Sequence, residues 1–317
     1  MSKRANQHHD HAPTPNTIWA VGGGKGGIGK SFISSNLAFC LSRLGKQVTL
    51  VDLDLGGANL HTCLGLKTPT LSLSDFISGR VSDIRDLATQ TEIPNLSFIG
   101  GFNDALNIAD LPKEERERLN AALRTLTTPY VITDLGAGTS ETTLDFFLGA
   151  DQKIVAVTPE PTSIENAYRF MKSSFYLHLR RSESELGIHA LIEAAMDPKN
   201  QHGIRSPSDL LKVVDKLDAA AGAKLRQRVE QFHLHLLLNQ VRTREDIDLG
   251  ESMRTVASRY FATEAQFLGF IDHDNAVWQA LRKRRPLMVE FPYSSVVGQF
   301  LKISKLLLNP QPFRAVI

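Results

Sequence analysis

Cysteine is scarce in this chain, and long apolar runs are missing. The 317 residues contain two cysteines, Cys40 and Cys63, with no C-x-x-C spacing. This excludes a disulfide scaffold or a cysteine-rich zinc site and indicates a reducing, cytoplasmic compartment. No apolar run approaches the roughly 20 residues that span a bilayer, and the N-terminus lacks the apolar stretch of a signal peptide. We expect residues 1–16 to form a disordered tail without chemistry of its own.

An excess of charge of either sign is also missing. The 36 basic residues balance 34 acidic ones and leave a net charge of +2, so bulk charge does not indicate a nucleic-acid or membrane partner. The length and the 42% hydrophobic content suit a large core in one α/β domain rather than two separate domains.

Short, continuous apolar runs separated by helical patterns are typical of a parallel sheet buried on both faces. After a first strand at residues 17–21, the runs fall at residues 47–52, 96–100, 130–134, 153–158, 234–239 and 267–271. We therefore predict an α/β fold with a doubly wound, mostly parallel sheet of about seven or eight strands. The predicted domain covers residues 17–309, and residues 310–317 form a short tail.

One connection is longer than a crossover helix requires. Between Thr158 and Leu234 lie 75 residues, in which we expect a crossover helix at 163–179 and a helical insertion at about 180–232. Ser206 as N-cap and Pro207 at the first position open a helix predicted to run toward Phe232. A further helix is expected within 182–197. A packing lobe and a partner-binding lobe explain this segment equally well.

Residues 22–31 read GGGKGGIGKS and match the phosphate-binding pattern G-x-x-x-x-G-K-[ST]. Glycines let backbone N–H groups face the phosphates, the lysine reaches the β and γ oxygens, and the hydroxyl holds Mg²⁺. The chemistry indicated is binding of a nucleoside triphosphate between a strand and the start of a helix. The residues expected to contact the nucleotide are Gly24, Lys25, Gly26, Gly27, Ile28, Gly29, Lys30, Ser31 and Phe32.

Two lysines in this loop, Lys25 and Lys30, make it resemble the deviant loop of the MinD/ParA class of P-loop ATPases. The resemblance implies an ATPase that uses Mg²⁺ and forms an ATP-dependent homodimer, in which Lys25 reaches across the interface to the partner's nucleotide. A second cation near the transferred phosphoryl group stabilises the charge on its oxygens. Lys25 and Lys30 are therefore candidate catalytic residues.

Two carboxylates, Asp52 and Asp54, follow a strand within the sequence VDLDLGGANL. Both are expected to project beyond the sheet near the phosphate loop. The resemblance implies that Asp52 meets Mg²⁺ through water and that Asp54 orients or deprotonates the attacking water. Asn59 is expected to help hold this first switch. The alternative is a pair of carboxylates that caps the next turn.

Asp134 ends the strand at 130–134 and is followed by glycines, as in a Walker B acid with a second switch. We expect Asp134 and Ser31 to hold Mg²⁺, while Gly136 and Gly138 free the backbone to move when the γ-phosphate leaves. Asn239 ends the strand at 234–239. In the class that the chain resembles, an amide at this position reads the adenine edge.

Within that class, residues 158–172, TPEPTSIENAYRFMK, are very similar to a segment of the FlhG (FleN, YlxH) branch, which controls flagellar number and placement. Residues 53–66, 135–147 and 272–295 are also similar to it. The resemblance implies a switch that positions or counts a cellular structure and binds a protein cargo or regulator on the dimer surface. The segment DQAxxLR, through which that branch activates the GTPase FlhF, is absent before the phosphate loop, which argues against that partnership.

Two surface features bear on other partners. A helix is expected at 294–308, and the nine residues after it, with two prolines, cannot form an amphipathic membrane-targeting helix. We therefore expect weak or no autonomous membrane binding. The basic cluster at 282–285 fits the solvated end of a helix better than a DNA contact, which leaves a ParA-type DNA-binding partition ATPase as the alternative. Neither cysteine is placed for an iron–sulfur cluster between subunits.

Overall fold

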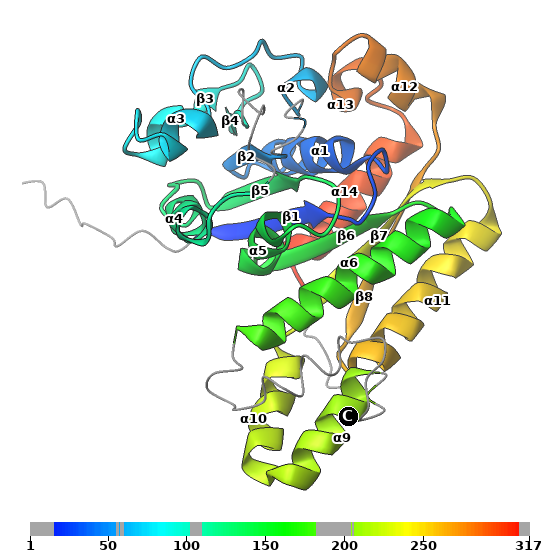
Figure 1. Ribbon diagram of the computed structural model, residues 1–317. Coiled ribbons are helices and arrows are strands. Elements are labelled where there is room, and N and C mark those ends of the chain that lie inside the picture. The colour runs from blue at the N-terminus through cyan, green and yellow to red at the C-terminus, as the bar shows by residue number, and fades with distance from the viewer. Residues whose placement is uncertain are drawn as a thin grey trace, which may run out of the picture.

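The structure is a computed structural model that describes residues 16–54, 57, 60–101, 110–181, 204 and 206–310. Its centre is an eight-stranded sheet with the order β3-β4-β2-β5-β1-β6-β7-β8 (Figure 1). The strands are β1 Thr17–Gly22, β2 Val48–Leu53, β3 Thr89–Gln90, β4 Leu96–Ile99, β5 Tyr130–Leu135, β6 Gln152–Val157, β7 Leu234–Val241 and β8 Ala265–Asp272. Only the short edge strand β3, which the apolar pattern did not predict, is antiparallel among them. The predicted doubly wound, mostly parallel sheet is confirmed.

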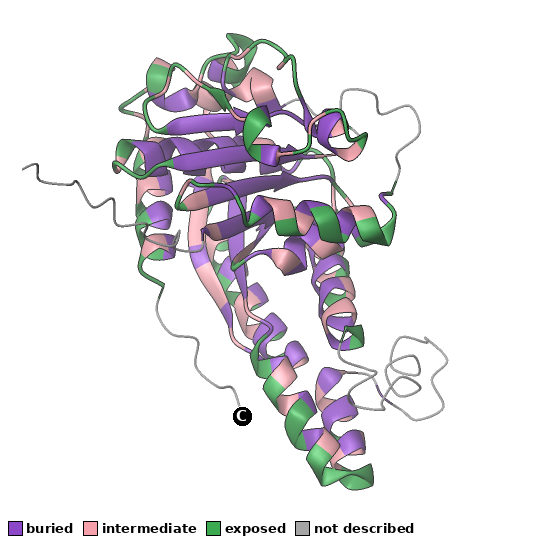
Figure 2. Cartoon of the chain, turned by 90° about the vertical axis from the view of Figure 1, so that its left-hand side faces the viewer, coloured by how far each residue is buried: buried purple, intermediate pink, exposed green. Residues whose placement is uncertain are grey.

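Helices cover both faces of the sheet (Figure 1). They are α1 Lys30–Arg43, α2 Leu60–Cys63, α3 Leu73–Ile77, α4 Lys113–Leu123, α5 Glu141–Gly149, α6 Pro161–Arg180, α9 Pro207–Leu217, α10 Ala219–Glu230, α11 Arg244–Phe261, α12 Asn275–Arg282, α13 Leu287–Glu290 and α14 Ser295–Leu308, with a 3₁₀ helix η1 at Ile84–Leu87. Alternate residues of β1 enter different cores: Trp19 packs with α1 and α14, and Ile18 packs with α5 and α6. A strand buried on both sides explains its continuous apolar sequence (Figure 2).

The strand order places particular residues of distant segments side by side. β5 lies between β1 and β2, so that Asp134 pairs with Val21 on one side and with Asp52 on the other. Both carboxylates stand at the carboxyl ends of their strands, which is the edge where ligands bind in open α/β sheets. The strand order thus places the carboxylates of Asp52 and Asp134 beside the loop that follows β1.

Between Ser206 and Phe232 the structure has two helices, α9 and α10, where one helix was predicted. Ser206 caps α9 as expected, and its hydroxyl accepts a hydrogen bond from the Asp209 N–H. The predicted continuation toward Phe232 is wrong, because the chain turns at Asp218, whose carboxylate accepts from Ala220 N at 2.8 Å and starts α10. α9 and α10 form a hairpin that projects away from the sheet (Figures 1 and 2). The helix expected within 182–197 lies outside the described residues.

The two ends of the described domain are well anchored. Asn16, at the predicted boundary of the tail, is buried, and its amide donates to Leu123 O at 2.9 Å and to Leu126 O at 3.1 Å. At the other end, α14 confirms the predicted closing helix, with an apolar face buried against α1 and β8. Within the described ranges, no helix is both long and apolar enough to cross a membrane.

Candidate functional site

The glycine-rich loop joins β1 to α1, as its sequence predicts. Gly27 and Gly29 have φ angles of 77° and 90°, a region that a residue with a Cβ rarely adopts. Gly24 is required for space, because a Cβ there would lie 2.1 Å from the carbonyl oxygen of Asn166. Gly29 is the N-cap of α1 and has no side chain to cap the first N–H groups. These groups and the helix dipole form an anion site at the start of α1.

Lys30 is the buried cation of this loop. Its ammonium group donates to the carbonyl oxygen of Lys25 at 3.4 Å, across the bend of the loop. Burial lowers the pKa of Lys30, and the carboxylates of Asp134 and Asp54 oppose that effect. The lysine is therefore placed between the anion site and the acids at the strand ends.

Asp52 and Asp134 face each other on β2 and β5. Burial, with a smaller effect of the Asp134 charge, raises the pKa of Asp52 to about 8. Burial also raises the pKa of Asp134 to about 6, while hydrogen bonds from Ser31 and Ser34 act in the opposite direction. The Ser34 hydroxyl donates to Asp134 Oδ1 at 2.9 Å. Two acids in a desolvated site favour a bound cation, since a nearby positive charge restores their ionised form.

The donor set suits Mg²⁺ bound together with a phosphate. Magnesium in nucleotide sites keeps several waters and takes only one or two carboxylates from the protein. In the part of the chain that the structure describes, no group of three or more His, Cys, Asp or Glu is arranged to hold a metal alone. The hydroxyl of Ser31, which contacts Asp134, and the two opposed carboxylates thus fit a metal whose other ligands are phosphate oxygens and water.

Asp54 lies where the two predicted switches meet. It directly follows β2, and its backbone N–H donates to Asp52 Oδ1 at 3.1 Å. A Cβ built on Gly136 would lie 3.1 Å from Asp54 Oδ1, so the second switch packs closely against this carboxylate. Gly138 has a φ of 93° and continues the glycine-rich turn. Asn59, which was expected to support the first switch, lies outside the described residues.

Lys25 is turned toward α6 of its own chain. Its ammonium group donates to Glu160 Oε2 and to the hydroxyl of Thr162, each at 3.0 Å. The side chains of Lys25 and Glu160 are 37% and 59% exposed, and an ion pair this open contributes about 0–1 kcal/mol. The contact is therefore weak enough for Lys25 to exchange it for another anion.

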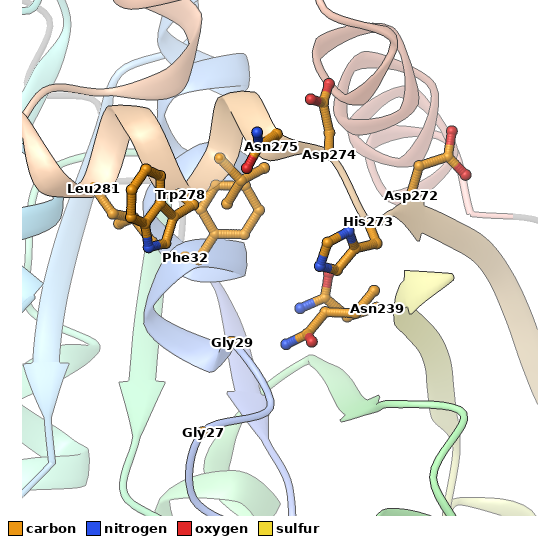
Figure 3. Close-up of a pocket in the computed structure, with 12 residues that line it drawn as sticks. Gly27, Gly29, Phe32, Asn239, Asp272, His273, Asp274, Asn275, Trp278 and Leu281 are labelled. Atoms are coloured by element: carbon orange, nitrogen blue, oxygen red, sulfur yellow. The ribbon is translucent and has the colours of Figure 1, made fainter. Parts of the chain in front are cut away.

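A cavity of about 620 Å³ continues from the loop along the ends of β7 and β8 (Figure 3). Asn239 stands at its border, and its amide Nδ2 donates to the Ile28 carbonyl oxygen at 2.8 Å. The structure thus brings the predicted Asn239 to the loop, and its reading of a base stays a prediction. The residues that line the cavity are Gly27, Gly29, Phe32, Asn239, Gln240, Asp272, His273, Asp274, Asn275, Val277, Trp278 and Leu281.

The wall formed by α12 and the β8–α12 turn was missed in the sequence. The sequence did contain a signal for this wall, because an apolar helical pattern at 275–282 follows closely after the predicted strand at 267–271. All other predicted site residues that the structure describes gather at this edge of the sheet. Of the basic cluster, Lys283 and Arg285 both pair with Glu290, and Arg282 lies over Trp278.

Comparisons with known proteins agree with this geometry. The sequence profile of the CobQ/CobB/MinD/ParA nucleotide binding domain matches residues 19–287. The antiactivator FleN of Pseudomonas aeruginosa is 27% identical over 293 residues, which are 92% of this chain and 86% of FleN. The flagellum site-determining protein YlxH of Helicobacter pylori is 31% identical over 161 residues, 48% of this chain and 52% of YlxH.

Solved structures show the same fold at low identity. The septum site-determining protein MinD of Pyrococcus horikoshii, in complex with Mg-ADP, superposes with a TM-score of 0.59 at 18% identity. The superposition covers 92% of this chain and 96% of that protein.

Proposed function

The chain belongs to the CobQ/CobB/MinD/ParA family of nucleotide-binding domains, and on that premise we propose that it is a Mg²⁺-dependent ATPase switch, dimeric with ATP, that controls the number or position of a cellular structure. The observation that carries the proposal is one constellation. A glycine loop with two lysines faces Asp52, Asp54 and Asp134 at one edge of the sheet. The similarity to FleN over nearly the whole chain favours the regulatory role.

Binding uses the loop and its two neighbouring strands. The N–H groups of residues 24–31 hold the phosphates and Lys30 contacts the β and γ oxygens. Ser31, Asp134 and Asp52 are the residues that would hold Mg²⁺. When bound, Mg²⁺ neutralises charge on the phosphate oxygens and on the two buried acids. Phe32 borders the cavity beyond the loop, and Asn239, held to the loop by its hydrogen bond to the Ile28 carbonyl oxygen, contacts the base.

Hydrolysis needs a water aligned with the γ-phosphorus. Asp54 orients that water and accepts its proton, so that the products are ADP and inorganic phosphate. Because Gly136 packs against Asp54, loss of the γ-phosphate at one switch moves the other. In the dimer, Lys25 leaves Glu160 and Thr162 and contacts the nucleotide of the second subunit, where its charge stabilises the transferred phosphoryl group.

The wider setting is part of the same proposal. We place the protein in the cytoplasm, in accord with its two free cysteines, and give the ATP dimer a protein cargo or regulator as partner. The domain limits at residues 17 and 309, with an insertion at about 180–232, belong to this proposal as well. The hairpin of α9 and α10 provides an exposed lobe on which such a partner has room to bind.

The DNA-binding alternative receives less support from the surface. Lys283 and Arg285 both pair with Glu290, so two of the four cations at 282–285 already contact an anion of their own chain. A gel shift with ATP at two salt concentrations separates the two functions. Binding to phosphates weakens steeply with salt, whereas the proposed switch gives no shift at either concentration.

Phosphate release from the Asp54→Ala variant tests the proposed function. We expect hydrolysis to fall by at least about 100-fold, since the water loses its proton acceptor, while ATP binding is kept. Asp248→Ala removes an exposed carboxylate on α11 and serves as the matched control. Normal turnover in Asp54→Ala, or no ATP binding by the wild type, would overturn the assignment.

A further inference from the structure

The two tryptophans of the chain stand in opposite environments. Trp19 is 1% exposed within the core, whereas Trp278 is 55% exposed on α12. Within α12, all of which the structure describes, Ala280 is the residue that is fully buried. Trp278 therefore does not fill the core. The indole instead forms part of the cavity wall beside the glycine loop (Figure 3). An exposed indole in such a wall offers a large, rigid apolar surface to a ligand.

Arg282 holds this indole in place. Its guanidinium carbon lies 4.7 Å from the centroid of the Trp278 ring, and the two residues are one helical turn apart on α12. Such a cation–π contact covers one face of a ring and leaves the other available. Within the basic cluster, Arg282 thus differs from Lys283 and Arg285, which pair with Glu290.

The dimensions of the cavity connect Trp278 to the nucleotide. One end of the 620 Å³ space is formed by Gly27 and Gly29, where the phosphates bind in the proposed function. The rest extends past Phe32 to Trp278 and Leu281 on α12. A nucleotide anchored by its phosphates has to place its ribose and base in this remaining space. The base then meets an aromatic wall on one side and the polar amide of Asn239 at its border.

We propose that Trp278, positioned by Arg282, is the surface on which the base of the bound nucleotide stacks. The inference rests on the proposed nucleotide binding and adds the residue that provides affinity for the base. Stacking accepts every base because each has a π face, whereas a hydrogen-bonding amide distinguishes base edges. Trp278 therefore sets how tightly any base is held, and the choice between adenine and guanine is left to Asn239.

Titration of Trp278→Ala with ATP, GTP and inorganic triphosphate tests the stacking. We expect roughly a tenfold to hundredfold weaker affinity for both nucleotides by the same factor, from the loss of one stacked base, and unchanged affinity for triphosphate, which has no base. Trp278→Phe keeps an aromatic face and recovers most of the affinity. Val289→Ala, at a 45% exposed apolar residue outside the cavity, is the matched control.

Arg282 is tested as a positioning residue through the indole itself. ATP should quench the tryptophan emission of the wild type and leave that of Trp278→Phe unchanged. Arg282→Ala should lower this quenching and weaken ATP binding a fewfold, and Arg282→Lys should restore both.

Two results with the Trp278→Ala variant would overturn the stacking role. Unchanged ATP affinity in Trp278→Ala excludes the contact with the base. An equal loss of affinity for triphosphate would mean that Trp278 supports the conformation of the phosphate loop and does not contact the base. In either case wild-type ATP binding still supports the proposed function. A wild-type chain that binds triphosphate and ATP equally would overturn the base site alone, and one that binds neither would refute both proposals.

Discussion

The carboxyl end of the sheet buries two acidic side chains, and its amino end buries two basic ones. The two pairs differ in whether they have hydrogen-bond partners that suit a structural role or a position that suits a ligand. At the carboxyl end, burial raises the pKa of Asp52 and of Asp134. A metal ion bound with a phosphate would lower both pKa values again, because a nearby positive charge favours the ionised carboxylates. At the amino end, burial lowers the pKa of Lys153 to about 8 and that of His235 to about 3. These groups find partners within the chain: Lys153 Nζ donates to Ala150 O at 2.8 Å, and His235 Nε2 lies 2.6 Å from Gln152 Oε1.

This difference distinguishes buried groups that bind a ligand from buried groups that stabilise the fold. The contact of His235 with Gln152 joins β7 to β6, and that of Lys153 with Ala150 fixes the turn before β6. The buried acids beside the phosphate loop are instead placed to gain from a bound cation. Shifted pKa values alone would have indicated a functional site at both ends of the sheet. In the described part of the chain, only the carboxyl end combines such groups with a glycine-rich loop at the start of a helix.

The largest expected effect comes from removing the cation at the carboxyl end. Lys30→Ala deletes the charge between the phosphates and Asp134, and we expect ATP hydrolysis to fall by at least about 1,000-fold with ATP binding strongly weakened. Steady-state phosphate release and calorimetric titration measure the two effects. Lys46→Ala, at an exposed lysine before β2, should behave as wild type. Near-normal hydrolysis in Lys30→Ala would place the chemistry elsewhere.

The buried acids should make the nucleotide-free protein less stable as the pH rises from about 4 to about 8. The folded pKa of Asp52 is about 8 against 3.8 for the free group, so the folded state holds the extra proton and stability is lost as the pH rises through this window. The slope is on the order of 1.4 kcal/mol per pH unit for one proton. Urea unfolding between pH 5 and pH 8 should show this decline in the wild type.

Two changes should remove this decline in stability between pH 5 and pH 8. Asp52→Asn has no proton to lose, and saturating Mg-ATP stabilises the ionised acids of the wild type. Asp248→Asn is the control at an exposed position. If Asp52→Asn keeps the full slope, the buried acid pair does not set the pH dependence.

The histidines at the amino end should act in the opposite direction. The folded pKa of His235 is about 3 against 6.5 for the free group, so stability is present above pH 6.5 and is lost as the pH falls toward 3. His235→Gln should flatten this acid limb in urea unfolding between pH 4 and pH 7 and leave the effect of Mg-ATP unchanged. His273→Gln changes an exposed histidine and is the control for the acid limb in the absence of Mg-ATP, because His273 lines the cavity. An unaltered acid limb in His235→Gln would assign the sensitivity to other groups.

The smallest effect is expected at the exposed contact of Lys25. Glu160→Ala removes an ion pair that contributes about 0–1 kcal/mol, so the melting temperature should change little. If the contact restrains Lys25, the variant should dimerise with ATP as well as the wild type or somewhat better. Sedimentation at graded ATP concentrations measures this. Weaker dimerisation would show that Glu160 itself belongs to the interface.

Much of the fold was predictable because its signals are local. Each buried strand carries its own apolar run, and the glycine loop requires particular residues at Gly24, Gly27 and Gly29 for steric reasons. The turn at Asp218 was missed because an N-cap within a helical pattern competes with continuation of the helix, and spacing alone does not decide between them. The edge strand β3 is too short to show a pattern.

The site was only partly predictable, because some of its contacts depend on strand order. Asp52 and Asp134 each lie one residue before the end of a strand, but they pair with each other only because β5 lies between β1 and β2. Trp278 lies far from the loop in sequence and reaches it through the β8–α12 turn. The contact of Lys25 with Glu160 likewise joins two segments 135 residues apart.

The mass of the Asp54→Ala protein in the presence of Mg-ATP tests the central claim most directly. With hydrolysis blocked, sedimentation should show a dimer with ATP and a monomer with ADP, and the double variant with Lys25→Ala should remain largely monomeric with ATP still bound. A monomer with ATP, or a dimer that forms equally with ADP, would contradict the account of this chain as an ATP-dependent dimerising switch.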